Sequence, residues 1–223
     1  MFFTKNTFLS AFILLGFIAW SMAMTLLSSF AMTKTILKGD ASSFVLELPP
    51  YRRPQFFKII WQTIKEKVIF VLLRAVVVAA PAGLVIWVLA NIKVGNSMLL
   101  NVIADFLNPI GSFMGLDGVI LLAFILGFPA NEIVIPIILM AYLSTGELGD
   151  YSSLESLRTI LVDNGWTATT AICTCVFSMF HFPCSTTLLT IWKETKSVKW
   201  TAMSVAVPLM IGTVLCVLIN TIF

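Results

Sequence analysis

The chain has 223 residues, of which 59% are hydrophobic and only 11% charged, and its mean hydropathy is +0.99. Soluble domains carry about half apolar and about a quarter charged residues, so this composition excludes a soluble globular enzyme and predicts an integral membrane protein with the lipid bilayer as its surroundings. The formal net charge of +3 comes from a few basic segments beside apolar ones, which indicates membrane orientation and gives no reason to expect a nucleic-acid partner.

The N-terminal part of the chain is predicted to cross the membrane once. Residues 8–32 form an apolar run of about 25 residues, which is longer than a signal-peptide core and suits a first transmembrane helix. Residues 34–67 carry seven lysines and arginines against three acidic residues, so the positive-inside rule places them in the cytoplasm. The prolines of residues 48–54 require extended chain, and residues 55–67 have the apolar spacing of an interfacial helix.

Two further uninterrupted spans are predicted downstream. The second span covers residues 68–90 and holds Arg74 near its cytoplasmic end, where snorkelling to the surface explains the charge better than function does. The last span covers residues 200–223. Residues 91–117 read as a linker whose weakly amphipathic stretch, residues 99–107, we expect to lie outside the membrane, packed on the bundle.

Two apolar stretches between these spans are interrupted by residues that break helices. The breaks are residues 127–132, between arms 119–126 and 133–143, and residues 181–187, between arms 166–180 and 188–192. Open backbone groups at membrane depth are tolerated only where protein buries them or a water-filled cavity meets them, and in transporters such broken helices build the substrate site. The fold expected is therefore an all-α, polytopic helical bundle with broken or re-entrant helices.

The first interrupted stretch allows two topologies. If residues 119–143 cross the membrane, the acidic loop 144–165 falls inside and the lysines of residues 193–199 fall outside, against the positive-inside rule. A re-entrant hairpin with its tip at residues 128–132 removes the conflict.

Glu132, beside Asn131, is the candidate site residue of the first break. A charged side chain near the bilayer centre costs about 2.5 to 3.5 kcal/mol on insertion scales, so the default interpretation of such a residue is function. The alternative is that Glu132 caps the following half-helix through its backbone amides. Both interpretations can hold together.

The second break gathers soft donors. Cys175, His181 and Cys184 offer thiol and imidazole groups that suit transition metals better than sodium or calcium, which suggests a path for a metal ion. Thiols also pack ordinarily in apolar interiors, and a lone histidine is more often structural than a ligand. Cys173 and Cys175 point about 200° apart on a helix, so at most one of them faces the break.

Catalytic signatures do not occur in these 223 residues. There is no Gly-x-x-x-x-Gly-Lys-Ser/Thr loop for a nucleotide and no His-Glu-x-x-His pair for zinc. The chain is therefore expected not to be an enzyme and to bind no permanent cofactor.

Three motifs identify a family resemblance. Glu47-Leu-Pro-Pro-Tyr-Arg52, Gly127-Phe-Pro-Ala-Asn-Glu-Ile133, and Phe182-Pro-Cys184 followed by Trp192-Lys-Glu-Thr-Lys196 resemble the ferrous iron transport protein B (FeoB) family, over essentially the whole chain. The resemblance implies a gate repeat like those of nucleoside transporters. It implies a central membrane module at residues 1–91, a linker at 92–117 and a second gate domain at 118–223.

The same resemblance implies roles for the site residues. Iron-pathway roles transfer to Glu132 and Cys184, with His181 and Cys175 as further candidates, while Asn131 stands where many members have lysine. The family's GTPase domain and first gate repeat are not among these residues, so the chain resembles a fragment, a split subunit or a truncated reading frame. Its implied partner is the portion bearing the GTPase and first gate, with a homo-oligomer as another possibility.

The leading hypothesis is therefore the membrane-spanning part of a ferrous iron (Fe²⁺) importer in the inner (plasma) membrane of a prokaryote, in which Fe²⁺ is the transported ion. Two rivals stay open. A gate-repeat transporter of nucleosides or another solute would use Asn131, Glu132 and nearby hydroxyls to bind its cargo. A non-transporting scaffold or degenerate fragment would dock a partner through the basic segment at residues 48–67.

Overall fold

The computed structural model describes residues 7–35, 55–95, 97–144 and 154–223. Within these ranges, three helices are long and apolar enough to cross a membrane: α1 (Thr7–Thr35), α3 (Ile69–Asn91) and α10 (Val198–Ile222). The bent pair α4 and α5 adds a fourth candidate span if it is counted as one. The predicted class, a polytopic all-α membrane protein with broken helices, is confirmed. The chain divides into two units, residues 3–67 and residues 68–223.

The first unit contains α1 and a short amphipathic helix. Three α1 hydroxyls bond back to carbonyls of their own helix, including Thr25 to Ser21 (2.9 Å) and Thr33 to Ser29 (2.8 Å), so these hydroxyls need no water. The interfacial helix expected at residues 55–67 is present as α2 (Phe56–Thr63), continued by π-helical turns over Ile64–Val68. The proline-rich stretch, residues 48–54, lies outside the described residues.

The second unit begins with α3 and a small hairpin. Strands β1 (Lys93–Val94) and β2 (Ser97–Met98) pair antiparallel, and Gly95 supplies the positive φ of 67° that the tight turn needs. Helix α4 (Leu99–Phe113) follows at once. The amphipathic stretch predicted at 99–107 is therefore helical, but it continues six residues further, through Pro109.

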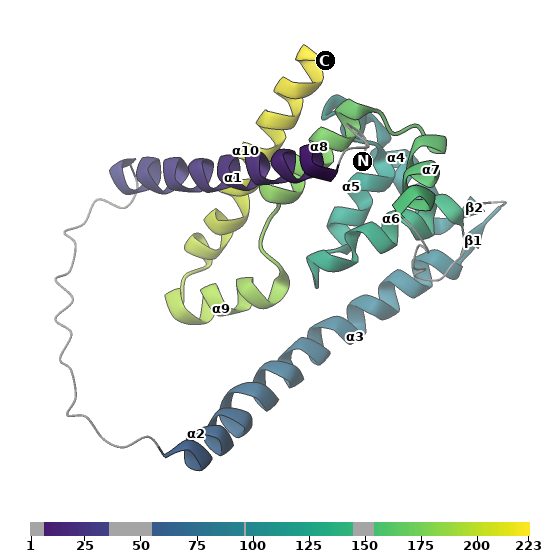
Figure 1. Cartoon of the computed structure of the whole chain (residues 1–223). Helices are drawn as coiled ribbons and strands as arrows, with labels where there is room; N and C mark the ends of the chain where they lie inside the picture. The colour runs from purple at the N-terminus through teal and green to yellow at the C-terminus, as the bar shows by residue number, and fades with distance from the viewer. Residues whose placement is uncertain (1–6, 36–54, 96, 145–153) are drawn as a thin grey trace. The chain divides into compact units, whose positions relative to one another are not determined.

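The first interrupted stretch is a helical hairpin. Helix α5 (Gly118–Leu126) ends at the break, the 3₁₀ turn η2 (Asn131–Ile133) follows, and α6 (Val134–Leu143) returns (Figure 1). The Tyr142 hydroxyl at the end of α6 donates to the carboxylate of Asp117, the N-cap of α5. The outer ends of the two arms therefore meet in a helical hairpin, which is the geometry that the re-entrant alternative requires, and its topology in the membrane stays a prediction.

The second interrupted stretch packs against the last span. Helix α7 (Leu154–Asp163) occupies part of the region read as an acidic loop, and α8 (Ala168–Met179) leads to the break before α9 (Ser185–Thr195). Helices α8 and α10 run antiparallel, since Cys173 lies against Cys216 while a Cβ on Gly212 would stand 3.0 Å from the Cβ of Phe180. The break therefore begins level with the middle of α10.

Candidate functional site

The two helix breaks touch each other. The amide of Ser185 donates to the carbonyl of Phe128 at 3.0 Å, and the rings of Phe128 and Phe182 lie 5.8 Å apart. One turn earlier, Phe124 of α5 meets Phe177 of α8 with ring centroids at 4.9 Å. Helices α5 and α8 thus run side by side in the same direction and end at one place near the middle of the unit.

Gly127 makes the first break possible. A Cβ at this position would stand 2.5 Å from Cγ2 of Val134 and 3.0 Å from the carbonyl oxygen of Ala123, so a side chain would push α6 away from α5. The turn closes with the amide of Ala130 bonding to the Gly127 carbonyl at 3.0 Å. The glycine in the motif is therefore required by close approach of the two arms.

Glu132 is exposed at the start of the returning arm. It lies in η2 beside the exposed Asn131, and within the described residues its carboxylate has no hydrogen bond or ion pair. Neither η2 nor α6 is capped by a side chain, so the capping interpretation of Glu132 finds no hydrogen bond to support it. Its oxygens are free to meet an ion.

Cys184 is the N-cap of α9 and is half-buried. Its sulfur lies 3.1 Å from Oγ1 of Thr186 and 3.2 Å from Oγ1 of Thr187. Two hydroxyls and the positive end of a helix dipole favour negative charge on the sulfur, which is the form that binds metals. These two threonines thus reach the thiol, whereas Thr190 shows the back-bonding expected of membrane hydroxyls, to the Thr186 carbonyl at 2.9 Å.

His181 is buried in an aromatic cluster between α5 and the second break. Its ring stacks on Phe182 at 3.8 Å and lies 5.1 Å from Phe124, and its Nε2 stands 3.3 Å from the Phe124 carbonyl oxygen. From the sequence, the hydroxyl of Ser185 could line a pore or bond back to a helix carbonyl; in the structure it is buried without a partner among the described residues, so no back-bond is present. Only the fold reveals that feature, because the hydroxyl is hidden by the contact between the breaks.

The cysteines of α8 diverge as their spacing predicted. Cys173 is fully buried and exchanges thiol-to-carbonyl contacts with Cys216 at 3.8 and 3.4 Å, while Cys175 is exposed. Across residues 7–35, 55–95, 97–144 and 154–223, no three His, Cys, Asp or Glu side chains gather closely enough to hold a metal ion. The candidates stand singly along the breaks, and their metal-binding role stays a prediction.

A polar chain missed by the sequence reading ties the outer ends of the arms together. Asp117 accepts from the Ile120 amide at 2.6 Å and from the Tyr142 hydroxyl, and that hydroxyl accepts from Nε1 of Trp166 at 2.8 Å. An aspartate directly before an apolar run is a recognisable helix-start signal, but its partners 25 and 49 residues away leave no local trace.

Apolar half-helices that meet at their breaks define a gate-type membrane domain. A family model described as nucleoside recognition matches residues 72–198, and a second model, the ferrous iron transport protein B C terminus, matches residues 14–65. The chain belongs to the ferrous iron transport protein B (FeoB) family, as its motifs predicted.

Relatives named Fe(2+) transporter FeoB share the sequence over most of the chain. The Staphylococcus aureus (strain COL) protein is 32% identical over 226 residues, covering 96% of this chain and 32% of that protein. The Synechocystis protein is 31% identical over 173 residues, covering 75% and 26%. The Methanocaldococcus jannaschii protein is 25% identical over 224 residues, covering 94% and 32%. The chain spans about a third of the length of these relatives, and no solved structure matches it significantly.

Proposed function

We propose that this chain forms part of the Fe²⁺ path of a ferrous iron importer, in the inner (plasma) membrane of a prokaryote. It acts with a portion that carries the GTPase and the first gate. The observation that carries the proposal is the junction of the two breaks, where the Ser185 amide bonds to the Phe128 carbonyl inside a chain of the FeoB family. Membership of that family, whose matched relatives are named as Fe²⁺ transporters, supplies the cargo.

The two helices that follow the breaks, α6 and α9, each begin with a group that can bind Fe²⁺. Glu132 supplies a hard oxygen donor before α6, and Cys184 supplies a soft sulfur donor at the N-cap of α9. A path needs donors that bind an ion strongly enough to admit it and weakly enough to release it, so single donors in series suit cargo better than a closed cage. Asn131 adds a neutral amide oxygen beside Glu132.

His181 and Cys175 take secondary places in this proposal. The Nε2 of His181 faces the Phe124 carbonyl and holds the second break against α5, while its buried Nδ1 has no partner among the described residues and is the atom open to ligation. Cys175 is exposed on α8 and can meet an ion only if it faces the path in the complete transporter. The division at residues 1–91, 92–117 and 118–223 also stays a prediction, and the matched gate model itself begins at residue 72.

A second candidate function is transport of a nucleoside or another polar solute. The description of the matched family model, nucleoside recognition, favours it. Asn131, Glu132 and the hydroxyls of Thr186 and Thr187 would then bind the cargo. Such a transporter would take up labelled nucleoside and be indifferent to Fe²⁺.

The test is anaerobic uptake of ⁵⁵Fe²⁺ by an iron-uptake-deficient bacterium that expresses the chain with the GTPase and first-gate portion of a relative. We expect uptake to fall by about tenfold or more for Glu132→Ala and for Cys184→Ser, as for loss of a metal-binding group. Glu155→Ala, which removes an exposed carboxylate from α7, is the matched control and should leave uptake unchanged. Full uptake by both site variants would refute the assigned path, and no uptake with membrane expression confirmed would favour the scaffold hypothesis.

A further inference from the structure

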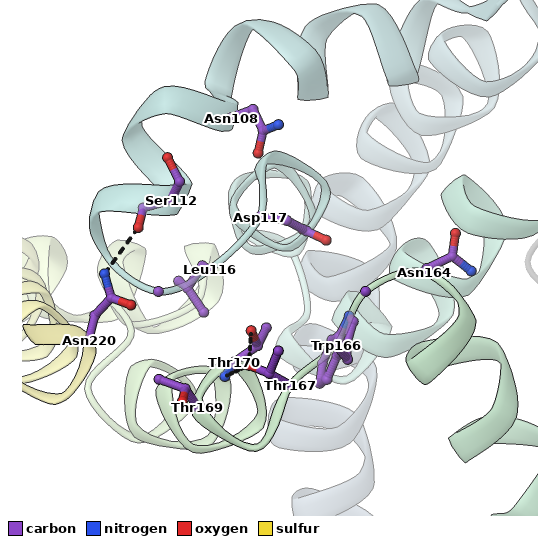
Figure 2. Close-up of a pocket in the computed structure, with 12 residues that line it drawn as sticks. Asn108, Ser112, Leu116, Asp117, Asn164, Trp166, Thr167, Thr169, Thr170 and Asn220 are labelled. Atoms are coloured by element: carbon purple, nitrogen blue, oxygen red, sulfur yellow. Dashed lines mark hydrogen bonds between the residues drawn. The ribbon is translucent and has the colours of Figure 1, made fainter. Parts of the chain in front are cut away.

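A polar pocket of about 310 Å³ lies at the far end of α5 and α8 from the breaks. Its wall comes from four parts of the chain: α4, the N-cap of α5, the turn into α8, and the end of α10 (Figure 2). The side chains that matter below are Asn108, Ser112, Asp117, Asn164, Thr169 and Asn220. The predicted path uses none of them.

Close packing and side-chain hydrogen bonds build this pocket. Gly118 lets α5 start against α4, since a Cβ there would stand 1.9 Å from the Ala104 carbonyl oxygen. Asn220, near the end of α10, donates to the carbonyls of Ser112 and Phe113 at 3.2 and 3.3 Å, and so ties α10 to the end of α4 (Figure 2). The pocket is thus fixed by contacts among distant elements.

Helix α4 shows that the pocket lies at a membrane surface. Leu100, Ala104 and Gly111 face the core, while an exposed apolar stripe follows the next face: Val102, Phe106, Ile110 and Phe113. A third face carries Asp105, Asn108 and Ser112, and the last two line the pocket. A helix with one buried, one lipid-facing and one polar stripe lies in the plane of the interface.

The distance to the breaks agrees with this depth. Helix α5 has 9 residues and α8 has 12, which at helical rise are about 14 and 18 Å long. Half of a hydrocarbon core is about 15 Å, so breaks near the midplane put the pocket at an interface. Asn220, near the C-terminal end of α10, lies at the pocket, whereas the N-terminal end of α10 is flanked by Lys193, Lys196 and Lys199. The positive-inside rule places these lysines in the cytoplasm, and therefore places the pocket on the external side.

The charge of the pocket favours a cation over an anion. Asp117 is the only charged side chain that lines it among the described residues. The two helix N-termini that open there are already capped, α5 by Asp117 and α8 by Thr167, which accepts from the Thr170 amide at 3.1 Å. Each carboxylate oxygen of Asp117 accepts one bond and keeps a further lone pair. An anion would meet this carboxylate and find one amide of each N-terminus already bonded to its cap.

The size and donors of the pocket suit an ion that keeps its water. A volume of about 310 Å³ corresponds to about ten waters at about 30 Å³ each, enough for an ion with six. One carboxylate with amide and hydroxyl groups can hydrogen-bond such a shell, while the described residues offer no cluster for direct ligation. Divalent ions that dehydrate reluctantly are held in this way.

We propose that this pocket is an external receiving site that holds a hydrated divalent cation through Asp117 before the cation reaches the breaks. The proposal rests on the proposed function and adds to it a place where the ion waits with its water shell. Asn164, Thr169 and Asn220 bind the water shell, and α5 and α8 lead from the pocket to Glu132 and Cys184.

Thiol labelling of the whole chain in intact cells tests the proposal without any need for transport. Thr169→Cys is introduced after Cys175→Ser and Cys184→Ser, leaving only the buried Cys173 and Cys216. A membrane-impermeant maleimide should label it from outside. Mn²⁺ should slow this labelling about tenfold at about ten times its dissociation constant, because the free fraction falls with occupancy. Choline chloride at equal ionic strength should leave the labelling rate unchanged.

Asp117→Asn supplies the decisive comparison, because the Oδ1 of an asparagine can still cap α5 and its Nδ2 can donate to the Tyr142 hydroxyl. With the cap kept through Oδ1 and the Tyr142 contact kept through Nδ2, this variant should keep the labelling of Thr169→Cys and abolish the protection by Mn²⁺. Ser97→Cys, exposed on the hairpin after α3 and outside the pocket, is the matched control and should be labelled without Mn²⁺ protection. Labelling only from the cytoplasmic side, labelling without protection, or protection that survives Asp117→Asn would each overturn the proposal. Protection that depends on Asp117, together with no ⁵⁵Fe²⁺ uptake by the chain that keeps Cys184, would instead count against the proposed function and leave the receiving site standing.

Discussion

Gly118 is the position where one methyl group should do most harm to the fold. Its absent Cβ would stand 1.9 Å from the Ala104 carbonyl oxygen and 2.8 Å from the Asn108 amide nitrogen, both backbone atoms of α4. Neither atom can move without shifting the helix. Gly118→Ala must therefore separate α4 from α5 at the point where they form the wall of the pocket.

The magnitude follows from the type of contact. Overpacking a well-packed site costs about 1 to 3 kcal/mol, and a clash with backbone places this change at the upper end, about 3 kcal/mol. For a chain of this length, about 1 kcal/mol shifts the melting temperature by about 2 to 4 °C, so we expect a loss of about 6 to 12 °C. Gly83→Ala on α3 is the matched control, because a Cβ at Gly83 meets nothing within 4 Å.

The assay is thermal unfolding of the detergent-purified chain, followed by the fraction that stays monodisperse on size-exclusion chromatography after heating. Gly83→Ala should be neutral or stabilising by up to about 1 kcal/mol, since alanine is the better helix former. A Gly118→Ala protein that melts within about 2 °C of the unsubstituted chain would refute the close packing of α4 on α5, given that about 1 kcal/mol shifts melting by that amount.

Two further changes test the contacts between distant elements. Tyr142→Phe removes the hydroxyl that donates to Asp117 and accepts from Trp166. It should lower the unfolding free energy by about 1 to 3 kcal/mol, measured by the same melting assay. No change in melting temperature would contradict the hairpin closure. Gly212→Leu should force α10 from Phe180 and make Cys173 and Cys216 react with maleimide, whereas thiols that stay protected would show that the helix contact is looser than described.

The sequence could predict the features that depend on neighbouring residues. The breaks appear as glycine, proline and polar residues inside apolar runs, and the divergence of Cys173 and Cys175 follows from helical rotation alone. The motif residues around Glu132 and Cys184 were also sufficient to identify the FeoB family. Local patterns therefore gave the fold class, the breaks and the candidate donors.

The sequence could not predict the features that depend on contact at long range. The hairpin closure between Asp117 and Tyr142 brings the outer ends of α5 and α6 together, yet neither residue signals the other across 25 positions. Helix α4 passes Pro109 because packing on α5 compensates for the missing amide, which outweighs local propensity. The polar pocket combines residues from position 108 to position 220, whose individual polarity would equally fit ordinary loops.

The hydrogen bond from the Ser185 amide to the Phe128 carbonyl joins the two helix breaks directly. One such bond contributes only about 0.5 to 1.5 kcal/mol net, so releasing it requires little work. While it is closed, however, the tip of the first hairpin and the start of α9 must shift as one body. We therefore expect the hairpin tip and α9 to move together, so that a displacement of α9 is transmitted to the hairpin tip that carries Glu132.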